Sequence, residues 1–347
     1  MSKVKTDIRA LSKEELRNFF TKNGDKSFRG NQVYEWLWIK AAHSFDAMTN
    51  LSLETRQMLE ENFVINHIKV DKMQKSIDGT IKNAIKLHDD LIVESVLIPT
   101  KTRTTACVSS QVGCSLDCNF CATAKLKRMR NLNADEIYDQ VVEIDRQSQL
   151  YHNHKLSNIV FMGMGEPLLN YKNVMEAIHK ITSDEGLGMA SKRITLSTVG
   201  IPKMIKKMAD EEVKFNLAVS LHSAIDEVRS RLMPINDKNN LADLLESLQY
   251  WYEKTNRKIT FEYVVFKDHN DKQKDIDALV SYCKKIPSKV NLITYNTIGE
   301  EEFQTADKSV VNQYVKVLES HGIVAVIRRS RGDDIDAACG QLANKLG

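Results

Sequence analysis

Three closely spaced cysteines are the most chemically distinctive feature of the sequence. Cys114, Cys118 and Cys121 follow the spacing C-x3-C-x2-C. Thiolates at this spacing wrap one face of an iron–sulfur cubane and leave one iron without a protein ligand. Zinc is the alternative, but a structural zinc site needs four ligands, usually in paired C-x2-C knuckles. The sequence has no second knuckle, and Cys283 falls in a predicted helix. The pattern therefore favours a 4Fe–4S cluster.

A glycine-rich turn lies downstream of these cysteines, in the segment Gly163-Met164-Gly165-Glu166. Glycine lets the backbone come close to a ligand, and the carboxylate of Glu166 can accept hydrogen bonds from an ammonium group. Most turns of this composition are only turns. This one follows a predicted strand, one βα unit after the cysteines, so its position supports a ligand site beside the cluster.

Strand-like and helical patterns alternate from about residue 91 onwards. The predicted strands cover residues 104–109, 158–162, 194–197, 216–221, 259–265 and 290–295. The clearest helix starts at Asn133, with Glu136 as capping partner, and others lie near residues 170–182, 201–211, 240–254, 272–285 and 306–321.

This alternation predicts parallel βα units with right-handed crossovers. Six units are fewer than the eight of a closed barrel. We therefore expect an α/β fold with a partial (β/α)6 barrel over residues 91–347, and a flat doubly wound sheet is the alternative. In either case the functional residues gather at the carboxyl ends of the strands.

Residues 1–90 have a different pattern, which predicts a small helical domain. Ser12 and Glu15 form a capping box before a first helix, and further helices are expected from Gly30 and from Ser52. Residues 67–88 then alternate like linker strands, with a hairpin turn at residues 77–80. Basic residues between the short helices of this accessory domain suit a polyanion, and a solvated surface is the alternative.

Composition places the chain among soluble proteins. No apolar run reaches the roughly 20 residues that a membrane helix needs, and the N-terminus lacks the apolar core of a signal peptide. We therefore expect a cytoplasmic protein without a membrane partner, and a monomer by default. Its six cysteines are then ligands, reactive groups or core residues rather than structural disulfides. The net charge is only +3, but residues 101–130 carry six Lys or Arg and one Asp, which suits a polyanion.

The cysteine motif, with Phe120 before its last cysteine, resembles the signature of the radical S-adenosylmethionine (SAM) superfamily. The glycine-rich turn resembles the "GGE" element of that superfamily. The resemblance implies that SAM binds the open iron and that an electron from the cluster cleaves it to methionine and a 5′-deoxyadenosyl radical. It also implies an external one-electron reductant, of the flavodoxin or ferredoxin type.

Over nearly the whole chain the sequence resembles the RlmN-type dual-specificity RNA methyltransferases. The matching segments are residues 28–33, 94–99, 107–114, 163–167, 196–198, 220–223, 232–236 and 334–342. Such enzymes methylate carbon 2 of an adenosine in the peptidyl-transferase region of 23S rRNA. Many also methylate carbon 2 of the adenosine just 3′ of the tRNA anticodon.

The resemblance also assigns roles to residues. Cys339 corresponds to the cysteine that carries the methyl group, Cys107 to the cysteine that resolves the RNA adduct through a transient disulfide, and Glu94 to the proton acceptor. The resemblance further implies that two SAM molecules are used per turnover and that residues 1–90 form an accessory domain that helps to bind RNA. The SAM contacts implied by residue-wise matching are Gly165, Glu166, Ser197, Ser220, Leu221, His222 and Asn296. Without this context, isolated cysteines are more often small buried hydrophobic residues, and His222 is equally a candidate for the core. Cys283 matches no role.

Two alternatives remain open. Cfr-type relatives share the cysteines but methylate carbon 8 of the same rRNA adenosine and confer antibiotic resistance, whereas residues 28–36 look more like the carbon-2 enzymes. A cluster- or zinc-bearing RNA-binding protein without catalysis is the second alternative.

The loop of residues 125–130 is the best candidate for phosphate contacts. Trp36 and Trp38 are expected to pack in the core rather than to stack on bases.

Overall fold

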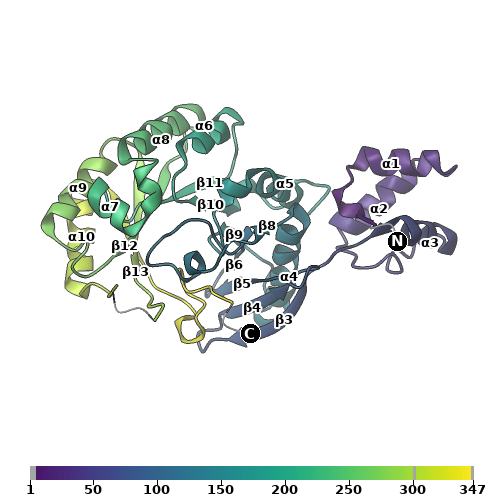
Figure 1. Cartoon of the computed structure of the whole chain (residues 1–347), viewed down its shortest axis with the longest axis horizontal. Coiled ribbons are helices and arrows are strands. Elements are labelled where there is room, and N and C mark those ends of the chain that lie inside the picture. Colours follow the sequence, from purple (N-terminus) through teal and green to yellow (C-terminus); the bar gives the residue numbers. More distant parts are fainter. Residues whose placement is uncertain (1–4, 300–301, 345–347) are drawn as a thin grey trace.

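The computed structural model describes residues 5–299 and 302–344. A group of short helices at the N-terminus lies at one end of a larger α/β part (Figure 1). No helix among the described residues is long and apolar enough to cross a membrane.

The larger part is built on a sheet of ten strands, in the linear order β14-β13-β12-β11-β10-β9-β6-β5-β4-β3. Neighbouring strands from β6 to β14 run parallel. These are β6 (Thr104–Cys107), β9 (Asn158–Phe161), β10 (Ile194–Thr198), β11 (Asn216–Ser220), β12 (Ile259–Val265), β13 (Ser288–Thr294) and β14 (Val324–Arg328). All six predicted strands are present, and the linear order leaves the sheet open, as a partial barrel requires. β14 is an additional parallel strand that the sequence analysis did not predict.

Three antiparallel strands extend the sheet beyond β6. They are β5 (Ile92–Pro99), β4 (Ile81–Lys86) and β3 (Lys69–Lys75). The predicted hairpin turn joins β3 to β4, where Gly79 adopts a φ of +86° that favours glycine. The predicted linker strands therefore belong to the large sheet by their hydrogen bonds, and a domain boundary near residue 90 stays a prediction.

Helices follow most of the parallel strands and line the outer side of the curved sheet (Figure 1). They are α4 (Ala134–His152), α5 (Tyr171–Thr182), α6 (Pro202–Asp210), α7 (Asp226–Leu232), α8 (Leu241–Thr255), α9 (Gln273–Cys283) and α10 (Lys308–Ser320). The predicted capping box of Asn133 and Glu136 begins α4. Most buried apolar residues of these helices and of the sheet form one continuous core, and a second apolar cluster includes Val228 and Leu232 of α7.

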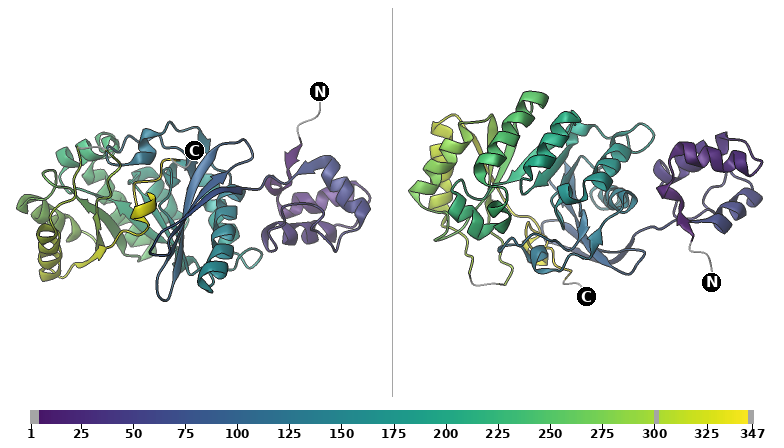
Figure 2. Two further views of the ribbon diagram at one scale, coloured as in Figure 1. Left: turned by 90° about the horizontal axis from the view of Figure 1, so that it is seen from below. Right: turned by 45° about the horizontal axis from the view of Figure 1, so that its top comes forward.

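The N-terminal helices form a small separate group beside α4 (Figure 2). They are α1 (Lys13–Lys22), α2 (Phe28–Trp38) and α3 (Leu53–Asn62), and β1 (Thr6–Asp7) pairs with β2 (Phe63–Val64). Ser12 and Glu15 make the predicted capping box. Gly30 lets α1 and α2 approach closely, because a Cβ there would lie 2.5 Å from the backbone nitrogen of Arg17. Trp38 is buried, as predicted, and packs edge-on against Tyr138 of α4.

Candidate active site

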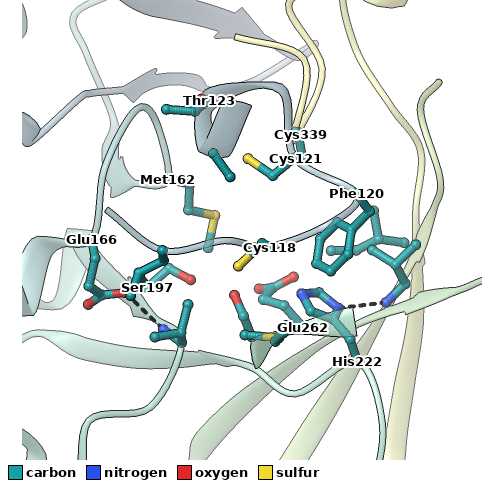
Figure 3. A pocket seen from close by; sticks show the side chains of 18 of the residues that line it. Cys118, Phe120, Cys121, Thr123, Met162, Glu166, Ser197, His222, Glu262 and Cys339 are labelled. Carbon is teal, nitrogen blue, oxygen red and sulfur yellow. Dashed lines mark hydrogen bonds between the residues drawn. The ribbon is translucent and has the colours of Figure 1, made fainter. Parts of the chain in front are cut away.

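The cysteine loop lies at the carboxyl ends of the parallel strands, where it walls the main cavity of the site. All three thiols of the loop line this cavity (Figure 3). The loop follows the short strand β7 (Gln111–Val112) and ends at the 3-10 helix of residues 122–125. Gly113, with a φ of +73°, makes the turn before Cys114, and a Cβ there would lie 2.4 Å from the carbonyl oxygen of Lys127.

The donor set of this loop fits an iron–sulfur cubane. A cubane takes one thiolate per iron, so three thiols around one cavity are suitable even though no three acidic, His or Cys side chains of the described residues converge on a single ion. Burial raises the pKa of Cys114 to about 11 and the pKa of Cys118 well above its usual range. These thiols therefore keep their protons at neutral pH until a metal displaces them.

The glycine-rich turn faces the cysteine loop from the end of β9. A Cβ on Gly163 would lie 2.7 Å from the hydroxyl of Ser109, and a Cβ on Gly165 would lie 2.5 Å from Gln111. Gly165 also has a φ of +92°. Glycine is thus required at both positions, because the turn packs directly on the chain that leads into the cysteine loop.

Glu166 ends this turn with a buried carboxylate. Its Oε1 accepts a hydrogen bond from the backbone of Leu168 at 3.0 Å, and its Oε2 accepts one from the backbone of Val199 at 2.9 Å (Figure 3). Burial raises the pKa of Glu166 to about 7. No Lys or Arg side chain of the described residues forms an ion pair with it. A buried carboxylate without a cationic partner suits a ligand that brings its own ammonium group.

The other predicted SAM contacts come from neighbouring strand ends. Ser197, Ser220, His222 and Asn296 line the main cavity together with Gly165 and Glu166. Leu221 does not line it, because its side chain is buried in the core.

His222 forms part of the cavity wall as a neutral ring. Its Nδ1 accepts a hydrogen bond from the backbone of Val264 at 3.1 Å, and its ring packs edge-on against Phe120. Burial, with a smaller contribution from Arg229, lowers the pKa of His222 to about 3. The backbone of His222 has a φ of +54°, unusual for a residue with a side chain.

Cys339 lies on a C-terminal segment that is fastened to the cysteine loop. The backbone of Ala122 donates to the carbonyl of Gly340 at 2.7 Å, and the hydroxyl of Thr123 donates to the carbonyl of Leu342 at 2.6 Å. The amide of Asn296 donates to the carbonyl of Cys339 itself at 3.2 Å. These bonds hold the exposed Cys339 side chain at the edge of the main cavity.

Cys107 lines a second cavity together with Cys339. Cys107 is the last residue of β6 and is buried. Burial and the nearby Cys339 raise the pKa of Cys107 to about 12, although Arg328 acts in the opposite direction. Because Cys339 also lines the main cavity, the two cavities meet at this residue.

Glu94 lines neither cavity. It lies on β5 with a fully buried side chain. Its Oε2 accepts a hydrogen bond from the backbone of Ala343 at 2.8 Å, and its Oε1 lies 3.5 Å from the Nζ of Lys82. The structure thus places Glu94 behind the segment that carries Cys339.

Comparison with known proteins agrees with this geometry. Residues 108–280 match the radical SAM superfamily, and residues 6–65 match the ribosomal RNA large subunit methyltransferase N-terminal domain. A Flavobacterium johnsoniae protein named "Probable dual-specificity RNA methyltransferase RlmN" is 69% identical over 98% of both chains. A protein of the same name from Bacillus licheniformis is 42% identical over 96% of this chain and 92% of its own.

This chain belongs to the RlmN family of radical SAM methyltransferases. The crystal structure of a radical SAM methyltransferase from Sphaerobacter thermophilus shares its fold, with a TM-score of 0.91 and 35% identity over 97% of this chain and 99% of the other. Membership of the superfamily implies a 4Fe–4S cluster and SAM as cofactors.

Two charged residues of this RlmN-family site were missed by the sequence analysis. Glu262 on β12 and Arg328 on β14 both line the main cavity, and their side chains pair at 3.3 Å. Glu262 is a charged residue inside an apolar strand, which is a signal that the sequence offered. Arg328 lies on the strand that was not predicted.

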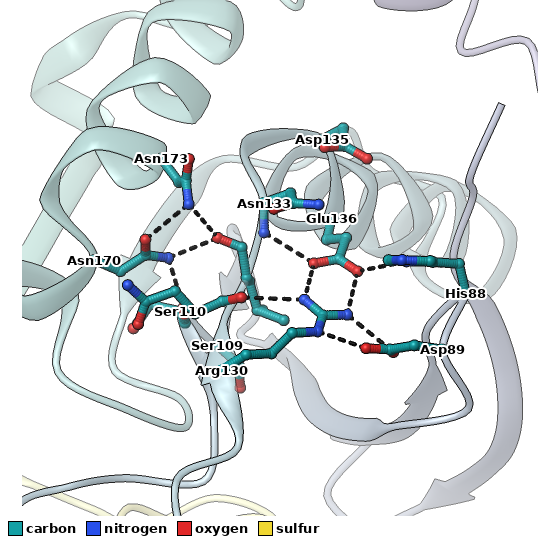
Figure 4. A network of polar contacts seen from close by, with 12 residues as sticks. His88, Asp89, Ser109, Ser110, Arg130, Asn133, Asp135, Glu136, Asn170 and Asn173 are labelled. Atoms are coloured by element: carbon teal, nitrogen blue, oxygen red, sulfur yellow. Dashed lines mark hydrogen bonds and ion pairs between the residues drawn. The ribbon is translucent and has the colours of Figure 1, made fainter. Parts of the chain in front are cut away.

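The basic loop of residues 125–130 forms some of its contacts within the protein. Arg130 pairs with Asp89 at 2.6 Å and with Glu136 at 2.7 Å, and Glu136 also contacts His88 (Figure 4). Arg130 therefore braces the loop against α4 and the turn between β4 and β5. The exposed positions of the loop are Lys125, Lys127, Arg128 and Met129.

Proposed function

We propose that this RlmN-family enzyme adds a methyl group to carbon 2 of an adenosine in 23S rRNA, and to carbon 2 of the adenosine just 3′ of the tRNA anticodon. The observation that carries the proposal is the position of Cys339, which lines both the cavity of the cysteine loop and the cavity of Cys107. The relatives are named dual-specificity RNA methyltransferases, which supports two RNA substrates.

The target atom explains why two further cysteines are needed. Carbon 2 of adenine lies between two ring nitrogens and is electron-poor, so it does not attack a methyl cation equivalent directly. When bound, the cluster and two SAM molecules per turnover supply a methyl group and a one-electron path. An external reductant of the flavodoxin or ferredoxin type supplies the electron. The residues of the chain must then hold the methyl carbon, accept a proton and release the product.

Cys339 first holds the methyl group as a thioether. One hydrogen atom of this methyl group would pass to the radical that the bound cofactors supply, and the carbon then forms the new bond to carbon 2. Glu94 accepts the proton that leaves carbon 2. One electron of the adduct returns to the one-electron path. The sulfur of Cys107 then attacks the sulfur of Cys339, so that a disulfide forms and the sulfur–carbon bond breaks with its electron pair on the carbon. This carbon takes up a proton to complete the methyl group, the methylated RNA leaves, and the external reductant returns the disulfide to two thiols. Burial holds Cys107 as a thiol at neutral pH, and the nearby Arg328 favours its ionised form. Residues 342–344 must move from Glu94 before it can reach a substrate.

The second cavity has the composition expected for an RNA substrate. Arg328, Arg329 and Arg331 line it together with the two cysteines. Guanidinium groups pair with phosphates, and an adenine inside folded RNA must be flipped out to reach a buried site. The exposed residues of the basic loop and the N-terminal helices offer further phosphate contacts.

The product decides between this proposal and the carbon-8 alternative. Anaerobically reconstituted protein is incubated with SAM, reductant and either a 23S rRNA fragment or tRNA, and the digested nucleosides are separated by mass spectrometry. The proposal predicts 2-methyladenosine from both RNAs. 8-Methyladenosine would assign the chain to the Cfr-type chemistry instead. SAM cleavage without RNA methylation would show that the substrate is wrong.

A further inference from the structure

Lys82 is a buried lysine for which the methylation mechanism gives no role. Its side chain is only 2% exposed and lies on β4, next to the strand that carries Glu94. Ala84 is directly opposite Glu94 in the antiparallel pair, and Lys82 is opposite Val96. Because alternate residues of a strand share a face, Lys82 and Glu94 are diagonal neighbours on the same face of the sheet.

The contacts of Lys82 connect two parts of the proposed machinery. Its Nζ lies 3.5 Å from Oε1 of Glu94, and it donates a hydrogen bond of 3.3 Å to the carbonyl of Asp336, three residues before Cys339. Asp336 and Cys339 belong to the same C-terminal segment. One ammonium group therefore contacts both the carboxylate of Glu94 and the backbone of the segment that carries Cys339.

The surroundings of Glu94 leave one oxygen available. Oε2 is held by the backbone of Ala343, whereas Oε1 accepts no hydrogen bond from any described residue. Lys82 is the only charged side chain in the described part of the chain that forms an ion pair with this carboxylate. A fully buried carboxylate without a positive partner takes up a proton rather than remaining charged.

We propose that Lys82 is a positioning residue that keeps Glu94 ionised, so that its Oε1, which accepts no hydrogen bond from the described residues, can receive a proton. The proposal rests on the proposed function, in which Glu94 is the proton acceptor. In that step the proton of carbon 2 moves to Oε1 of Glu94. The electron pair of the broken carbon–hydrogen bond stays on the adenine ring. Lys82 keeps its own protons throughout and does not touch the substrate.

The test compares Lys82→Met and Lys82→Arg with Lys86→Met, a matched control on the same strand. The side chain of Lys86 is 44% exposed and forms an ion pair with Asp90. Infrared difference spectra of each protein against the same protein carrying Glu94→Gln report the protonation state of Glu94 in the absence of RNA. We expect the C=O band of a carboxylic acid in Lys82→Met at neutral pH, and only carboxylate bands in the wild type, Lys82→Arg and Lys86→Met.

Methylation rates give the second readout. We expect Lys82→Met to lower kcat about a hundredfold at neutral pH, with KM for RNA unchanged and with activity recovering as the pH is raised. Lys82→Arg should retain most of the wild-type rate. Absence of the carboxylic acid band in a folded Lys82→Met protein would overturn the role of Lys82. If the band appears but the pH profile of methylation stays that of the wild type, then Lys82 does set the charge of Glu94, and the assignment of Glu94 as proton acceptor fails instead.

Discussion

At the scale of a single residue, the buried carboxylate of Glu166 lowers the stability of the folded protein at neutral pH. Burial raises its pKa from 4.5 to about 7. The folded state therefore binds more protons than the unfolded state between these two pH values, and stability falls as the pH rises through this window. We propose that the ammonium group of SAM reverses this penalty by pairing with the carboxylate.

Glu166→Gln should therefore remove a pH dependence while weakening SAM binding. In protein without cluster or SAM, we expect the wild type to lose up to about 3 kcal/mol relative to Glu166→Gln between pH 5 and pH 8. Chemical denaturation at several pH values measures this difference, and equilibrium dialysis of reconstituted protein measures SAM binding. Glu176→Gln, an exposed carboxylate on α5, is the control. Equal pH slopes for wild type and Glu166→Gln would contradict the account.

The sequence predicted those residues whose type and spacing are constrained by chemistry. The three cysteines of the loop and the glycines of the turn were found because a cluster and a close backbone approach require them. Lys82 and Arg328 could not be found, because their importance comes from neighbours that are distant in sequence. Lys82 contacts Asp336, and Arg328 contacts Glu262.

The turn of the β3–β4 hairpin forms hydrogen bonds with the segment that carries Cys339. The hydroxyl of Ser76 and the backbone of Ile77 both donate to Asp334, at 2.6 and 3.2 Å. In the other direction, the backbone of Gly332 donates to Asp78 at 3.1 Å. These reciprocal bonds fix the segment five to seven residues before Cys339.

Asp334→Ala should loosen this support and make the segment that carries Cys339 more mobile. We expect faster alkylation of Cys339 by iodoacetamide in unreconstituted protein, by several-fold, as judged by peptide mass spectrometry. Asp71→Ala, an exposed substitution on the same hairpin, should leave the rate unchanged. An unaltered rate in Asp334→Ala would show that the cysteine loop and Asn296 alone hold the segment.

At the element scale, the alternation of strands and helices was sufficient to predict six parallel strands and the helices between them. The missed strand, β14, has two adjacent exposed apolar residues, Val326 and Ile327, so it lacks both the alternation and the continuous burial of a recognisable strand. The missed helix, α7, spans only seven residues. The secondary structure of both elements depends on the elements that they pack against, because their own sequences lack a clear apolar pattern.

The two parts of the molecule are joined through a buried arginine. Arg9 precedes α1, is almost fully buried, and pairs with Asp135 at 2.9 Å and Asp139 at 2.7 Å on α4. The hydroxyl of Tyr138, on the same helix, donates to the carbonyl of Trp38 in the N-terminal group. These contacts orient the N-terminal helices relative to the active site.

Arg9→Ala should detach the N-terminal helices from α4. Removing one partner of a buried ion pair costs about 3–5 kcal/mol, so we expect rapid proteolysis near residues 65–68 and weaker RNA binding. SAM cleavage in the absence of RNA should be unchanged. Arg146→Ala, which removes an exposed pair with Glu143 on the same helix, is the matched control and should alter neither property. Equal protease resistance of Arg9→Ala and wild type would contradict a fastening role.

The central claim is that Cys339 and Cys107 act in sequence on one RNA adduct, and the fate of the RNA in cysteine variants tests it most directly. Reconstituted Cys107→Ala, Cys339→Ala and Cys283→Ala are incubated with SAM, reductant and a 23S rRNA fragment, then analysed on denaturing gels and by mass spectrometry. The account predicts a covalent RNA–protein adduct through Cys339 in Cys107→Ala, neither adduct nor product in Cys339→Ala, and normal 2-methyladenosine in Cys283→Ala. Release of methylated RNA by Cys107→Ala or Cys339→Ala would contradict it.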